Sequence, residues 1–167
     1  YLRSELAAQP GRSEAEVAVR FVRTPHESLV VRRIGEIRHG LYASAAYLGR
    51  RPVRGPGELH AHPLLVPSSG VELAWLRQLV PDLRPAFVSD VSLALAAAAA
   101  ADAGLTVLPR FVGDAAADLV HVPMPREPAQ PLWLTVHRDL RQTPRVRVLV
   151  DFLVATVRAD RALLLGG

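Results

Sequence analysis

The chain has 167 residues, enough to bury a hydrophobic core as one domain or as two small lobes. Half of the residues are hydrophobic and 22% are charged, so the composition excludes a disordered chain, and no uninterrupted apolar run is long enough to span a membrane. Cysteine is absent, which excludes disulfide bonds and thiol chemistry and fits a reducing cytoplasm. The net charge of +4 comes from dispersed arginines with no lysine, so it is weak evidence for nucleic-acid binding. Because the chain begins at Tyr1 rather than Met, we expect it to be a fragment.

Strand-like and helix-like segments alternate, which predicts an α/β fold with a largely parallel sheet. Ser44 and Thr143 are expected helix caps, and Pro56 and Pro144 are expected at helix starts. We expect strands over 16–21 (internal), 29–34 and 37–43 (separated at Gly35), 64–66, 86–88, 105–108, 119–122 and 132–136. We expect helices over 1–8, 45–50, 71–79, 91–103 and 111–117, and a helix start at Pro56. A final helix is expected from an apolar stripe of Val146, Leu149, Val150, Leu153 and Val157.

The segment 86–109 is the most informative part of the chain. A short apolar strand leads into a helix that has no polar face, so we expect that helix to be buried. Ser89 or Asp90 is expected to cap its start, and Gly104 is expected in the left-handed position that ends it. A second strand follows, and a strand–helix–strand unit predicts two parallel strands.

This unit also predicts a ligand site. The start of its helix lies beyond the carboxyl end of a strand, where open α/β sheets bind ligands and where helix N–H groups favour an anion. The polar turn at Ser68 and Ser69 follows another strand, and we expect it to face the same crevice. The alternative is an ordinary capped helix without a ligand.

The sequence offers no signature of catalysis. His60 and His62 could begin a metal site, but they lack further ligands at a recognisable spacing, so we expect no metal. No nucleophile elbow surrounds Ser68 or Ser69, and no phosphate-binding glycine loop is present. We therefore expect a protein that binds a ligand without transforming it, with no cofactor.

Several segments, in order, resemble the effector-binding domain of LysR-type transcriptional regulators. The similarity covers nearly everything from Glu14 to Arg158. The stretches that carry it are 14–20 (Glu-Ala-Glu-Val-Ala-Val-Arg), 28–35, 43–48, 58–64, Ser89-Asp90 with 104–109 (Gly-Leu-Thr-Val-Leu-Pro), and 144–153.

The resemblance implies a two-lobed fold like that of type II periplasmic binding proteins, with mixed, mainly parallel sheets. Lobe I would comprise 1–44 and 134–167 and would be incomplete, and lobe II would comprise 45–133. A small-molecule effector, possibly anionic, would bind between the lobes. Its contacts, carried over by position, would be Phe21, Val22, Ser68, Ser69, Ser89, Asp90 and Val91.

The resemblance further implies a cytoplasmic homodimer or tetramer. DNA would be bound only through an N-terminal winged helix-turn-helix that this chain lacks, and no membrane would be involved. Two departures from the family pattern stand out: the family's first strand, helix and strand are not all accounted for before 16–21, and Asp102 stands where a glycine is common. Two alternatives remain: an exported solute-binding protein of the same fold, and a hydrolase that uses Ser68 or Ser69.

Overall fold

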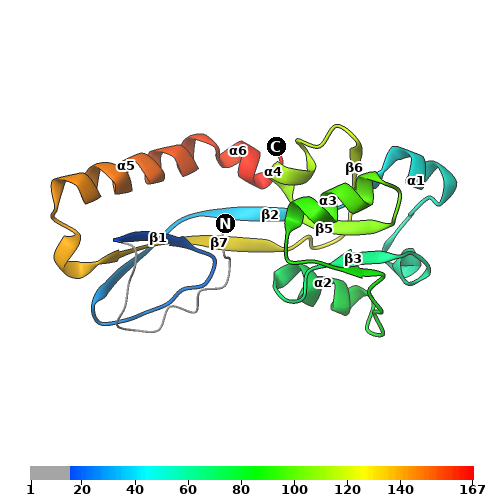
Figure 1. Ribbon diagram of the computed structural model, residues 1–167, viewed down its shortest axis with the longest axis horizontal. Coiled ribbons are helices and arrows are strands. Elements are labelled where there is room, and N and C mark those ends of the chain that lie inside the picture. The colour runs from blue at the N-terminus through cyan, green and yellow to red at the C-terminus, as the bar shows by residue number, and fades with distance from the viewer. Residues whose placement is uncertain (1–15) are drawn as a thin grey trace. The chain divides into compact units, whose positions relative to one another are not determined.

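The computed structural model describes residues 16–167 (Figure 1), so the helix expected over 1–8 lies outside the described residues. The chain forms two compact units. Unit 1 comprises residues up to Gly35 together with Pro131–Asp160, and unit 2 comprises Glu36–Gln130 and Arg161–Gly167.

The chain passes between the units at three places. It does so within β2 (Leu29–Ser44), within β7 (Ala129–His137), and between α5 (Pro144–Ala159) and α6 (Arg161–Leu165). The lobe boundaries expected from the sequence fall at 44 and 134, which differ from the boundaries of these units. The assignment of two lobes that bind an effector stays a prediction.

Unit 1 is built on antiparallel strands and one long helix. β1 (Val17–Arg20) pairs with β7, and a short 3-10 helix, η2 (Arg138–Leu140), connects β7 to α5. Helix α5 starts at Pro144 as expected, because proline's missing N–H costs nothing in a first turn. Since β1 lies at one end of the strand order of the described residues, the expectation of an internal strand is wrong.

The core of unit 1 contains Leu134 and Val136 of β7 and Val146 of α5. Val150 and Leu153 pack against it at helical spacing, as the apolar stripe predicts. Leu149 of the same expected stripe is instead exposed.

Unit 2 is a mixed sheet. β3 (Leu64–Val66) pairs in parallel with β4 (Phe87–Val88) and with β5 (Leu105–Pro109), which confirms the parallel unit expected from the sequence. β2 pairs antiparallel with β5 and with β6 (Leu119–Val122). The helical segments are α1 (Ala45–Arg50), the 3-10 helix η1 (Pro56–Ala61), α2 (Val71–Leu79), α3 (Ser92–Ala100) and α4 (Arg110–Gly113).

Both faces of the sheet in unit 2 are covered. Alternate residues of a strand point to opposite faces, and Leu64 and Val66 belong to one core cluster with Leu76 of α2. Leu65 belongs to a second cluster with Leu95 of α3. A central sheet with helices on both sides is the α/β class that the sequence predicts (Figure 1).

β2 corrects one expectation. The structure has one strand of 16 residues where two were expected on either side of Gly35. A glycine fits here because of packing rather than a turn: a Cβ at this position would lie 2.5 Å from Cγ1 of Val157.

The end of α3 corrects another. Asp102 takes the left-handed conformation with φ of 66°, so the expected role of Gly104 as the residue that ends the helix passes to Asp102. The side chain of Asp102 accepts hydrogen bonds from Ser44 and, at 2.7 Å, from Arg50. Gly104 is needed instead for close approach, since a Cβ would lie 2.3 Å from the Pro63 carbonyl oxygen.

Candidate functional site

Two strand-to-helix turns lie side by side at one edge of the sheet in unit 2. The turn Ser68–Gly70 follows β3, and Ser89–Val91 follows β4. Because β3 and β4 are parallel neighbours, with Val66 opposite Val88, their carboxyl ends reach the same edge. The hydrogen bond from Ser89 N–H to the Val66 carbonyl, at 3.0 Å, continues this pairing past β4. This edge is where sheets of this class bind ligands.

A carboxylate joins the two turns. Asp90 accepts a hydrogen bond from Ser68 N–H at 2.9 Å, and its two oxygens lie 2.8 and 2.9 Å from the Ser68 hydroxyl. The backbone hydrogen bond, followed by the hydroxyl, holds the pKa of Asp90 below its usual range. The donors expected to face a ligand carboxylate therefore contact a carboxylate of the protein itself. We call Ser68, Ser69, Ser89, Asp90 and Val91 the serine–aspartate edge.

The expected cap of α3 is wrong. The helix starts after Val91, and no side chain caps it. The carboxylate of Asp90 bonds to Ser68 instead, and the Ser89 hydroxyl accepts from Val91 N–H at 3.2 Å, one residue too early to cap the first turn. Helix α2 starts after Gly70, also without a side-chain cap. Neither first turn therefore has N–H groups bonded by an N-cap side chain.

A buried histidine and a partly buried carboxylate pair at the start of α2, and no sequence pattern predicts this pair. His39 of β2 is 2% exposed, and its Nε2 lies 3.0 Å from Oε1 of Glu72 in the first turn of α2. Burial raises the pKa of Glu72, but the hydrogen bond and charge of His39, together with a hydrogen bond from the backbone of Glu72, outweigh burial, so this pKa lies below its usual range. An acidic residue in a first turn is readable from sequence, whereas its partner lies 33 positions earlier and only the fold brings it near.

The other expected contacts belong to the other unit. Phe21 and Val22 follow β1 in unit 1, and their side chains are 44% and 69% exposed. Their participation in a common site stays a prediction.

One histidine of the pair, His62, makes a structural contact. His62 Nδ1 lies 2.8 Å from the Tyr47 hydroxyl, and burial lowers the pKa of His62. Within residues 16–167, no group of three or more metal-ligating side chains comes together. No helix among the described residues is long and apolar enough to cross a membrane.

Comparison with solved structures yields regulatory domains of bacterial transcription factors. The CrgA regulatory domain of Neisseria meningitidis is 20% identical, with a TM-score of 0.69 over 84% of this chain and 74% of that chain. The AmpR effector domain of Pseudomonas aeruginosa is 19% identical, with a TM-score of 0.67 over 87% of this chain and 73% of that one. The AphB regulatory domain of Vibrio vulnificus is 20% identical, with a TM-score of 0.64 over 84% and 75%.

These likenesses establish the fold expected from the sequence, that of LysR-type regulatory domains. No curated protein matches the chain in sequence. The family model described as the LysR substrate binding domain matches residues 3–158, nearly the whole chain. The chain therefore belongs to the LysR substrate-binding domain family.

Proposed function

We propose that this chain is the effector-sensing domain of a transcription regulator and that the serine–aspartate edge forms part of its effector site. The observation that supports this most directly is the pinning of two parallel strand ends by Ser68 and Asp90, beside two helix starts without side-chain caps. Such an edge offers hydroxyl and N–H donors in a fixed arrangement.

Asp90 competes with an effector for the hydrogen-bond donors of Ser68. An anionic effector has to take over the Ser68 donors from Asp90, which turns binding into an exchange of one carboxylate for another. That exchange releases the link between the turn after β3 and the turn after β4. The released link is a local change that effector binding can pass to the rest of the domain.

The same geometry argues against a hydrolase that uses Ser68 as its nucleophile. A nucleophilic serine needs a base that takes its proton, and the only group bonded to the Ser68 hydroxyl in the described part of the chain is Asp90. A carboxylate whose pKa is lowered is a poor base. The proposal is thus a domain that binds a small molecule and leaves it unchanged.

The rest of the proposal follows from family membership. The intact protein would bind DNA through an N-terminal winged helix-turn-helix, act in the bacterial cytoplasm, and form homodimers or tetramers whose geometry responds to the effector. Phe21 and Val22 would contribute contacts from unit 1. A winged helix-turn-helix encoded upstream of Tyr1 would support the regulator, and a secretion signal there would support the exported solute-binding protein.

The test starts with a thermal-shift screen of small carboxylates and amino acids, because a ligand bound only by the folded state raises the melting temperature. For an anionic hit, we expect Ser68→Ala and Ser69→Ala each to weaken binding about tenfold to a hundredfold in calorimetry, the value of a hydrogen bond to a charged group. Asp90→Asn should strengthen the same binding, since it removes a competing negative charge.

Thr156→Ala is the matched control, because Thr156 is exposed on α5 in unit 1 and its substitution should leave the affinity unchanged. Unchanged affinity in both serine variants would remove these residues from the site. Weaker binding of an anion by Asp90→Asn would contradict the exchange of carboxylates.

A further inference from the structure

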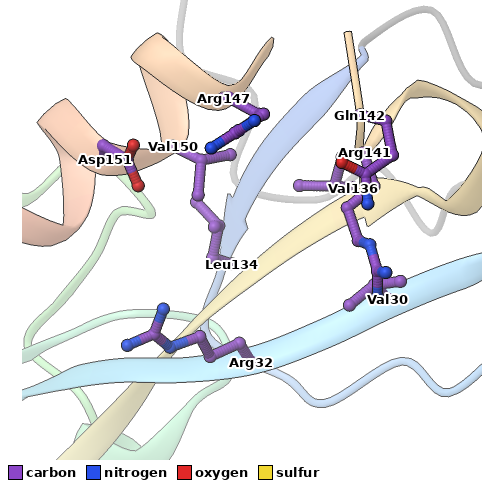
Figure 2. Close-up of a pocket in the computed structure, with 9 residues that line it drawn as sticks. All are labelled: Val30, Arg32, Leu134, Val136, Arg141, Gln142, Arg147, Val150 and Asp151. Carbon is purple, nitrogen blue, oxygen red and sulfur yellow. The ribbon is translucent and has the colours of Figure 1, made fainter. Parts of the chain in front are cut away.

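A separate cavity lies wholly within unit 1. Its volume is about 410 Å³, within the range of pockets that hold small molecules. Figure 2 shows its lining side chains, which come from β2, β7, α5 and the segment between β7 and α5. None of the residues expected from the sequence to contact an effector takes part in it.

The floor of this cavity is aliphatic. Val30 of β2 is joined by Leu134 and Val136 of β7 and by Val150 of α5. Leu134 and Val136 are two positions apart, so they share one face of β7, which is the strand next to β2. Both are buried in the core of unit 1, so the floor of the cavity is continuous with that core.

The rim is cationic. Arg32 lies two positions after Val30 on the same face of β2, Arg147 lies on α5, and Arg141 precedes that helix. All three are exposed, and no ion pair holds any of their guanidinium groups within residues 16–167. Asp151, four residues after Arg147, is the one acidic residue of the lining, so the cavity carries a net positive charge.

We propose that this cavity is a second ligand site that takes an amphipathic carboxylate, with an acid group at the arginines and an apolar body of about five to eight carbon atoms on the valine–leucine floor. The fork of a guanidinium group matches the two oxygens of a carboxylate. A bare phosphate would satisfy the arginines and leave the floor wet, and a neutral hydrocarbon would leave the charges unmatched. Only an amphipathic carboxylate matches both the arginine rim and the valine–leucine floor of the cavity.

The proposal is independent of the effector site, because the serine–aspartate edge lies in unit 2. Loss of either site by mutation should leave binding at the other intact. The two proposals can therefore fail separately.

Hexanoate is the probe, titrated at pH 7 into the isotopically labelled chain and followed by amide chemical shifts. We expect saturable shifts confined to residues 29–32, 134–136 and 141–151, with a Kd of about 1 mM for so small a ligand. The neutral analogue 1-hexanol and inorganic phosphate should each bind at least about fivefold more weakly. Shifts centred on the serine–aspartate edge, or none, would overturn the proposal.

Arg147→Gln should weaken hexanoate binding about fivefold or more, because it removes one charged hydrogen-bond donor from an exposed position without touching the core. Arg158→Gln is the matched control, since Arg158 is exposed on the same helix outside the cavity and should bind like the parent. Equal affinity of Arg147→Gln and the parent, or equal affinity for hexanoate and phosphate, would overturn the amphipathic site.

Discussion

At the residue scale, one carboxylate decides what the serine–aspartate edge would bind in the function that we propose for it. Asp90 occupies the donors of Ser68, so a guest with an acceptor group competes with it, whereas a guest with a donor group can approach its exposed oxygens directly. Order along the chain was enough to place Ser68 and Asp90 after neighbouring strands. It was not enough to predict their bond, because the residues are 22 positions apart and either could have faced a ligand.

The His39–Glu72 pair gives a prediction about pH. The pKa of Glu72 is lowered from 4.5 in the folded state, so this group stabilises the fold fully above about pH 4.5 and loses that contribution as the pH falls through the lower folded value. We expect Glu72→Gln to reduce the free energy of unfolding by about 1–2 kcal/mol at pH 7. The deficit should shrink as the pH falls below about 4.5. Urea denaturation at a series of pH values measures it.

Asp82→Asn serves as the control, since Asp82 is exposed between α2 and β4 and makes no ion pair in the described part of the chain. Its stability should follow that of the parent at every pH. A Glu72→Gln deficit that stays constant down to pH 3.5 would show that packing, not charge, explains the pair.

At the element scale, hydrophobic periodicity and the positions of breaking residues predicted most helices and strands. They did not predict the structural roles of individual glycines. Gly35 looked like a break and lies inside a continuous strand, because the absence of a Cβ makes room for Val157 of α5. Gly104 looked like the end of α3, yet Asp102 takes that conformation and is held there by Ser44 and Arg50. Each misreading depends on a contact with a distant element, which local sequence does not encode.

Two glycines with opposite surroundings test this interpretation. Gly104→Ala should lower the free energy of unfolding by about 2 kcal/mol or more, because its Cβ would overlap the Pro63 carbonyl and its φ of 152° strains any other residue. Gly49→Ala, in α1 with open space around it, should raise stability by about 0.5–1 kcal/mol. Chemical denaturation of both variants measures the difference.

Both residues change by one methyl group, so each is the control for the other. A stability loss for Gly49→Ala as large as that for Gly104→Ala would contradict the steric explanation at Gly104 and the entropic explanation at Gly49.

At the scale of the whole molecule, the alternation of elements predicted the α/β class, and ordered resemblance predicted the family. The sequence could not show where the chain passes between units, because β2 and β7 read as ordinary strands although each belongs partly to both. Continuous strands that serve two units can change their twist or pairing and so affect both.

The two units also differ in their cores, which predicts unequal local stability. Three buried residues centre the core of unit 1 among the described residues, whereas two larger clusters fill both faces of the sheet in unit 2. Because opening free energies follow buried apolar contacts, amides of α5 should exchange with solvent at least about tenfold faster than those of β3 and β5. Hydrogen exchange followed by mass spectrometry measures both in one sample.

A ligand gives this comparison its internal control. Hexanoate should slow exchange in α5 and leave β3 and β5 unchanged, since the cavity that we propose for it lies within unit 1. Equal protection of α5 and β5 without ligand would contradict unequal cores and would mean that the chain opens as one cooperative unit. Slower exchange in both units on adding hexanoate would show that β2 and β7 transmit binding from one unit to the other.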